Sequence, residues 1–207
     1  MNTNDPRFKK WDRWLDEIHK DIRKLLWYRY VFQEVGKIVE SNPKIQVPSE
    51  FYNWMISIYE EVVPAGVRRQ ADMHKDAISL AKLLYEIRCD SQVLSIAPNE
   101  VNKDLSELQK KSKVIKGYVD KTVAHLDKSK AKKLPTYKEL NECLDYLEEL
   151  LKKYLRLFRT THFPTIVPVY QYDWRVIFRR PWIEPAYPTD STWFPFPVEY
   201  KIQFFSW

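Results

Sequence analysis

Four side chains in the middle of the chain have the types and the spacing of a proton-transfer site. Tyr118, Lys121, Thr122 and His125 stand at positions i, i+3, i+4 and i+7, which is one face of a helix. They combine a phenol, an ammonium, a hydroxyl and an imidazole, and an imidazole titrates near neutral pH. His125 also falls near the C-terminal end of the predicted helix, where the helix dipole favours its protonated form. Such a histidine is suited to general acid–base catalysis.

The stretch around these residues carries the positive charge of the chain. Residues 103–133 contain 10 lysines and 4 acidic residues, a local excess of +6 that equals the formal net charge of the whole chain. An anionic partner such as a phosphate backbone is therefore plausible. The alternatives are ordinary structural roles: a histidine in a last turn is usually a cap or a surface residue, and a lysine-rich helix end is usually solvated. Val119 and Thr122 lie on the apolar stripe and are predicted to be core.

Composition excludes several other classes of protein. With 207 residues, 44% hydrophobic and 30% charged, the chain fits one folded domain, or one domain with an extension. No apolar run is long enough for a membrane span, and the start lacks a secretory signal. Cys89 and Cys143 are far apart and the histidines are dispersed, so we expect a cytoplasmic protein with no disulfide, metal or cofactor. A Gly-rich phosphate loop and a nucleophile elbow are both missing from the sequence.

Apolar residues that recur every three or four positions predict an all-α fold. Glycine occurs only three times, which also favours long helices over a turn-rich β protein. Pro64 and Gly66 predict a kink or a break in the second helix, and Asp76 is the predicted N-cap of the third. The five predicted helices cover approximately residues 11–40, 49–73, 77–88, 98–126 and 134–158.

The character of the sequence changes after Arg159. Residues 160–207 contain 7 of the 13 prolines and 14 of the 31 aromatic residues. The segments 167–178 and 199–207 are predicted to be extended and are candidates for short strands. The predicted organisation is thus a helical bundle, residues 1–159, and an aromatic- and proline-rich extension, residues 160–207, that packs on the bundle or on a dimer partner.

Two blocks of sequence resemble a known family. Residues 119–127, VDKTVAHLD, resemble the motif of HEPN domains, in which an arginine and a polar residue are followed a few positions later by a histidine. Upstream, residues 67–72, VRRQAD, and residues 78–84, ISLAKLL, resemble the second block of the AbiU-like abortive-infection branch. The blocks occur in the family's order, and the resemblance covers the helical part of the chain, residues 10–158.

The resemblance implies a HEPN-like bundle that forms a homodimer, with two histidine motifs facing each other across a cleft. Active members of the family are metal-independent endoribonucleases of phage defence or toxin–antitoxin systems. Their histidine handles protons while the ribose 2′-hydroxyl attacks the adjacent phosphate. By resemblance, His125 takes this role, and Asp120 orients the imidazole or the substrate hydroxyl.

The sequence departs from the family at the motif arginine, whose place is taken by Val119. A valine cannot donate hydrogen bonds to a phosphate or offset its charge. Lys121 could supply a point charge from within the motif, and Arg68 or Arg69 could supply a guanidinium from a neighbouring helix or a second subunit. The alternative for the arginine pair is that it bridges nearby acidic residues such as Asp72.

These observations leave two functions open. The first is an RNA-directed, metal-independent endoribonuclease with a degenerate motif. The second is a catalytically inactive HEPN dimer that acts as a nucleic-acid-binding or protein-interaction scaffold, in which the tryptophans of the extension stack on bases or bury an interface. An antitoxin protein is a further possible partner, and a membrane is not expected. The candidate catalytic residues are His125, Asp120 and Lys121, and the candidate binding residues are Arg68, Arg69, Tyr118 and Lys116.

Overall fold

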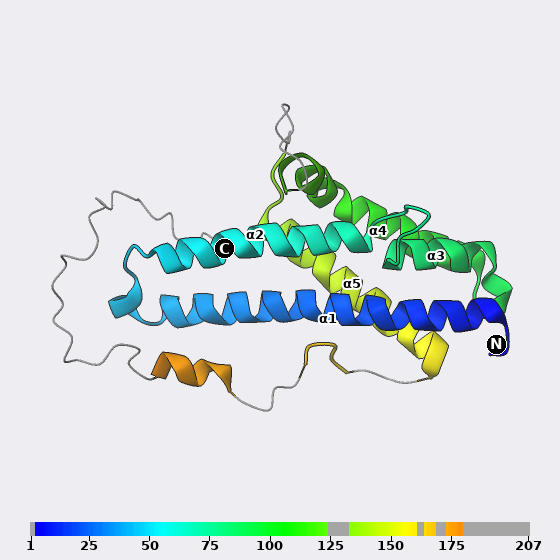
Figure 1. The fold of residues 1–207 in the computed structure, drawn as a ribbon, viewed down its shortest axis with the longest axis horizontal. Helices are drawn as coiled ribbons and strands as arrows, with labels where there is room; N and C mark the ends of the chain where they lie inside the picture. The colour runs from blue at the N-terminus through cyan, green and yellow to red at the C-terminus, as the bar shows by residue number, and fades with distance from the viewer. Residues whose placement is uncertain (1–2, 124–132, 161–163, 169–172, 180–207) are drawn as a thin grey trace.

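A computed structural model describes residues 3–123, 133–160, 164–168 and 173–179, and these form an all-α bundle (Figure 1). This confirms the predicted fold class. Within those ranges there is no strand, and no helix is long and apolar enough to cross a bilayer. A single π-helical turn, η3 (Val119–Val123), extends α4, and three short 3₁₀ turns complete the fold: η1 (Pro43–Ile45), η2 (Ser91–Val93) and η4 (Trp174–Arg179). The α-helices are α1 (Pro6–Glu40), α2 (Glu50–Gln70), α3 (Leu80–Cys89), α4 (Pro98–Tyr118) and α5 (Tyr137–Arg159).

Three of the α-helices, α1, α3 and α5, begin where a side chain accepts a hydrogen bond from one of the first backbone N–H groups. Thr136 and Glu139 form a capping box at the start of α5, each side chain accepting from the other's backbone N–H. At α3 the N-cap is Ser79, whose hydroxyl accepts from the backbone N–H of Lys82 at 3.0 Å. The prediction that Asp76 caps this helix was wrong. Because the helix starts later, Ile78 precedes it and is 49% exposed.

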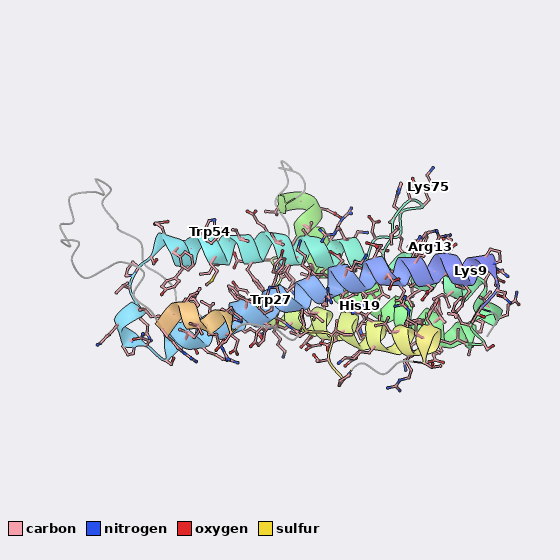
Figure 2. The ribbon with its side chains drawn as sticks, turned by 60° about the horizontal axis from the view of Figure 1, so that its bottom comes forward. Lys9, Arg13, His19, Trp27, Trp54 and Lys75 are labelled. Carbon is pink, nitrogen blue, oxygen red and sulfur yellow. The ribbon has the colours of Figure 1, made fainter. Side chains whose placement is uncertain are left out.

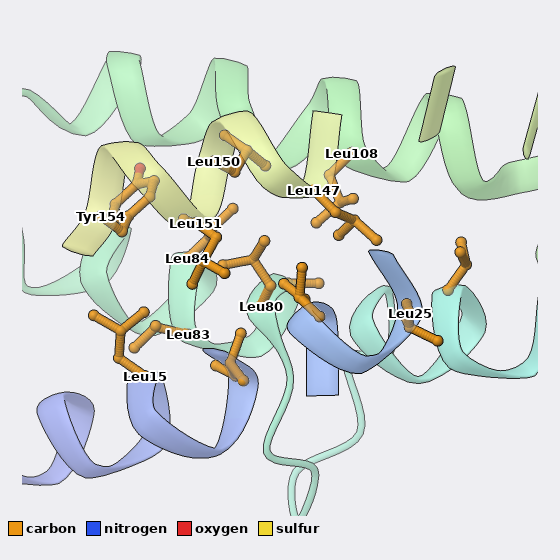
Figure 3. Close-up of a cluster of buried hydrophobic side chains, with 14 of the residues drawn as sticks. Leu15, Leu25, Leu80, Leu83, Leu84, Leu108, Leu147, Leu150, Leu151 and Tyr154 are labelled. Carbon is orange, nitrogen blue, oxygen red and sulfur yellow. The ribbon is translucent and has the colours of Figure 1, made fainter. Parts of the chain in front are cut away.

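The core is a layer of leucines shared by α1, α3, α4 and α5 (Figure 3). Each of these side chains is at most 2% exposed, and burying one leucine contributes about 1.5–3 kcal/mol. The helices that pack together include α3 with α4, α1 with α2, and α5 with both α1 and α4. In Figure 1, α2 runs back along α1 and α5 crosses both obliquely. The labelled core leucines are Leu15, Leu25, Leu80, Leu83, Leu84, Leu108, Leu147, Leu150 and Leu151.

The second helix was predicted to kink or break, and it does not break, because α2 runs from Glu50 to Gln70 through both Pro64 and Gly66. Gly66 is buried against α1, and a Cβ atom added there would lie 2.2 Å from Cδ2 of Leu25. A glycine at this position therefore allows the two helix backbones to approach closely. The contact with α1 holds α2 together across a proline that removes one backbone donor.

The described part of the extension also differs from its prediction. Residues 173–178 lie within a segment predicted to be extended, but residues 174–179 form the 3₁₀ turn η4. The ring of Trp174 packs edge-on against Trp27 and Tyr30 of α1, with ring centroids 6.3 and 6.5 Å apart. The second predicted strand, residues 199–207, lies outside the described residues.

Candidate functional site

Arg68, in the last turn of α2, connects the π-helical turn to the loop that follows α2. Its Nε donates a hydrogen bond to Oδ1 of Asp120 at 2.9 Å, and its Nη1 donates to Oδ2 of Asp72 at 3.0 Å. The structure thus brings together two of the residues that the sequence predicted for the site, Arg68 and Asp120. The Arg68 side chain stays 34% exposed, and among the described residues no hydrogen bond is made by its Nη2. Further N–H groups of this guanidinium are therefore available to an oxyanion.

The carboxylate of Asp72 holds the guanidinium from the other side. Burial raises the pKa of Asp72, but the backbone N–H of His74 and the charges of Arg68 and Lys116 outweigh it, so the pKa lies below its ordinary value. Asp72 is therefore ionised at neutral pH. Lys116, another predicted binding residue, is half-buried and acts on Asp72 through its charge. The cluster thus combines two cations with two carboxylates, counting Asp120.

The π-helical turn determines which residues of the motif are buried and which are exposed. Val119 is 2% exposed and belongs to the core, as predicted. The position of the family's motif arginine therefore points into the protein. Thr122 is exposed, although the regular helical period predicted it as core. In a π-helix the backbone bonds run from i to i+5, so an α-helical face that includes Tyr118, Lys121 and Thr122 does not continue through the turn.

Of the two remaining motif residues, the structure describes Lys121 but not His125. Lys121 is half-buried within η3, next to Asp120 in sequence. His125 lies outside the described residues, so its proposed role rests on sequence. Isolated π turns within α-helices occur frequently at functional sites. Asp120, the residue that Arg68 binds, is the second residue of this turn.

Arg69 and Gln70, although adjacent to Arg68, point to a different part of the molecule. Nη2 of Arg69 donates to Oδ1 of Asp21 on α1 at 2.9 Å. Gln70 is 2% exposed, donates to Oδ2 of the same aspartate at 2.7 Å, and accepts from the backbone N–H of Leu80 at 3.0 Å. The structure therefore does not bring Arg69 to the cluster around Asp120. The alternative role as a bridge to acidic residues fits both arginines, because Arg68 binds Asp72 and Asp120 and Arg69 binds Asp21.

A family model for HEPN AbiU2 proteins matches residues 8–176, which include α1 from its third residue, all of α2 to α5, η3 and the first residues of η4. This chain belongs to the HEPN AbiU2 family. It is therefore an abortive-infection-related HEPN protein with the all-α fold that its motifs predicted. No curated protein and no solved structure matches the chain.

Within this AbiU2 chain, sequence reasoning missed Glu60 and Tyr137, and it missed Gln70, which binds Asp21 of α1. Tyr118, a predicted binding residue, is half-buried and lines a cavity together with Glu60 and Tyr137. The hydroxyl of Tyr137 donates to Oε1 of Glu60 at 2.6 Å. The third, Gln70, had one available signal, because it is a polar residue on the otherwise apolar stripe of α2 that includes Val63. Nothing in the local sequence pairs Glu60 with a tyrosine that comes so much later in the chain.

Proposed function

We propose that this protein is a metal-independent endoribonuclease in which Arg68 supplies the guanidinium that the motif arginine supplies in other HEPN proteins. The observation that carries the proposal is the hydrogen bond from Arg68 Nε to Asp120, which places a guanidinium beside the degenerate motif. The remaining N–H groups of Arg68 are available to the non-bridging oxygens of a phosphate. The lysine-rich stretch from Lys103 to Lys133 supports an RNA substrate.

In the proposed reaction His125 removes the proton from a ribose 2′-hydroxyl. The 2′-oxygen then attacks the adjacent phosphorus, and the bond from phosphorus to the 5′-oxygen of the next nucleotide breaks. That 5′-oxygen takes up a proton from an imidazolium of the dimeric cleft, and the products are a 2′,3′-cyclic phosphate and a 5′-hydroxyl. Arg68 stabilises the negative charge that develops on the phosphate, while Asp120 fixes the guanidinium and Lys121 adds a positive charge.

A second candidate function is a scaffold that binds another protein chain, and a specific surface favours it. Large apolar side chains of α2 are exposed beside a groove between α1 and α2 of about 440 Å³. Such a face suits a second copy of the chain or an antitoxin. The two candidates are compatible, because the residues of α2 that line the groove, Met55 to Val63, do not include Arg68. The exposed side chains are Phe51, Trp54, Ile58 and Val62.

The test is cleavage of a mixed-sequence RNA in the presence of EDTA. We expect the wild type to leave a cyclic phosphate and His125→Ala to be inactive. Arg68→Ala should lower the rate about 10²–10³-fold, the typical effect of removing one stabiliser of transition-state charge. Arg69→Ala is the matched control and should stay within a few-fold of wild type, because Arg69 pairs with Asp21. Circular dichroism of each variant shows whether it is folded.

Two results would contradict the proposal: cleavage that survives His125→Ala, or equal losses in the two arginine variants. Inactive wild-type protein that still associates through the α1/α2 groove would favour the scaffold. Restoring the family's arginine with Val119→Arg is a poor test, because residue 119 is buried. A guanidinium there would be buried without a partner, which is strongly destabilising.

A further inference from the structure

One cavity lies beside the Arg68 cluster. It has a volume of about 120 Å³, is open to solvent, and is bordered by α2, the end of α4 and the start of α5. Pro64 lines it, and Arg68 follows Pro64 by four residues, about 6 Å along the helix axis. Tyr118 lines it too and directly precedes η3, which contains Asp120. Its other main lining residues are Glu60, Leu134, Tyr137 and Leu140.

Glu60 is the only acidic side chain among the described residues that line this cavity. The Tyr137 hydroxyl donates to its Oε1 at 2.6 Å and thereby orients the carboxylate. Among the described residues, no hydrogen bond reaches its Oε2. A carboxylate fixed through one oxygen retains lone pairs on both, and it can therefore accept two parallel hydrogen bonds from a ligand.

The two tyrosines form neutral aromatic walls. Burial and the hydrogen bond to Glu60 raise the pKa of Tyr137. Burial, together with the charges of Glu60 and Glu61, raises the pKa of Tyr118. Both phenols therefore remain protonated at neutral pH. The cavity is thus mostly apolar, has aromatic side chains, and offers one oriented acceptor group, which is the environment that a flat heterocycle with two adjacent donors requires.

Among the four RNA bases, guanine presents two adjacent donors on its Watson–Crick edge, N1–H and N2–H₂. Adenine and cytosine each present a donor beside an acceptor, and uracil presents a donor flanked by acceptors. Proteins that recognise single-stranded RNA read this edge by hydrogen bonds and stack the base on aromatic side chains. Of the four bases, therefore, only guanine offers a carboxylate two adjacent donors, one for each of its oxygens.

We propose that this cavity binds a guanine base of the RNA next to the cleaved phosphate, with Glu60 accepting from N1–H and N2–H₂ and Tyr118 stacking on the ring. The inference rests on the proposed ribonuclease function, because it assigns a base-specificity site to that reaction. Arg68, one helical turn from Pro64, then lies on the side of the bound nucleotide where its phosphate is attached.

The experiment has two arms, applied to wild type, Glu60→Gln and the matched control Glu61→Gln. Glu61 is the adjacent carboxylate, exposed like Glu60, but it does not line the cavity. In the first arm, cleavage sites are mapped on an RNA of mixed sequence. We expect wild type and Glu61→Gln to cut beside guanosine, and Glu60→Gln to lose this preference by a factor of about ten, since one bidentate base contact gives discrimination of that order.

The second arm needs no cleavage. Guanosine, adenosine, cytidine and uridine 5′-monophosphates are titrated against each protein, with binding followed by tyrosine and tryptophan fluorescence. Selective binding of the guanosine nucleotide that Glu60→Gln abolishes supports the cavity, even if no RNA is cut and the ribonuclease proposal fails. RNA cleavage with no base preference, or a guanine preference that Glu60→Gln retains, overturns the cavity and leaves the ribonuclease proposal intact.

Discussion

Along α2, the half from Glu50 to Val62 leaves large apolar side chains in contact with solvent, whereas the half from Val63 to Gln70 buries most of its residues. Trp54 is 58% exposed and lies on the outer side of the helix (Figure 2), and Val62 is 38% exposed. One residue later, Val63 is fully buried. The transition takes place within a single turn of one continuous helix.

The two halves differ because they have different neighbours. The second half packs on α1 at Gly66. It is also hydrogen-bonded to α3 through Gln70 and to η3 through Arg68. The first half packs on α1, and near its end Glu60 accepts a hydrogen bond from Tyr137 of α5. Trp174 from η4 lies at the edge of the groove between α1 and α2. Side chains that perform chemistry need fixed positions, which packed elements provide. Arg68, the arginine of the candidate site, is accordingly in the second half of α2, and the exposed apolar surface suited to a partner is in the first.

The largest stability effect that tests this comparison is expected at Gln70. Gln70→Leu leaves the backbone N–H of Leu80 without its acceptor and removes one donor from Asp21, in a position that is 2% exposed. We expect it to lower the free energy of unfolding by about 2–3 kcal/mol, because a buried unsatisfied group is costly. Urea denaturation measures this change. The exposed Gln92→Leu is the control, and an equal loss there would show that the network of Gln70 has no special role.

The apolar spacing in the sequence predicted most of the fold. The stripe of α5, which includes Leu140, Leu144, Leu147 and Leu151, is buried as expected, because an amphipathic helix has only one way to hide such a face. A kink or a break was predicted at Pro64 and Gly66, and the break does not occur, because local propensity takes no account of the packing of Gly66 on Leu25. Tertiary contacts outweighed a strong local signal at that position.

The candidate site could be predicted only in part. The residue types identified Arg68, Arg69 and Asp120 as candidates, but nothing local distinguishes two adjacent arginines. The choice of Arg68 depends on which helix face meets η3, and the two partners are 52 residues apart in sequence. The exposure of Thr122 could not be predicted either, because a π turn changes the period on which the prediction relied.

Two adjacent valines give the sharpest local test of the boundary in α2. Val63→Ala should destabilise the protein by about 2 kcal/mol, since it removes two buried methyl groups from the core. Val62→Ala makes the same chemical change at a 38% exposed position and should stay within about 0.5 kcal/mol of wild type. Thermal unfolding of both proteins provides the comparison. Similar losses would mean that the first half of α2 is as tightly packed as the second.

The smallest expected effect concerns the close approach of α1 and α2. Gly66→Ala places a Cβ atom 2.2 Å from Cδ2 of Leu25, which is itself buried, so the core must shift. Overpacking of this kind costs about 1–3 kcal/mol, and the better helix propensity of alanine offsets about 1 kcal/mol of it. We therefore expect a net destabilisation of about 1 kcal/mol, measured by urea denaturation.

The matched control for that change is Gly117→Ala, because a Cβ atom at this exposed residue of α4 meets nothing within 4 Å. Only the propensity effect remains, so this variant should be stabilised by about 0.5–1 kcal/mol. The two substitutions are chemically identical, and opposite signs would isolate the packing of α2 on α1 as the cause. If Gly66→Ala also stabilised the protein, Leu25 would have room to move. The half of α2 that positions Arg68 would then be less constrained by α1 than its burial indicates.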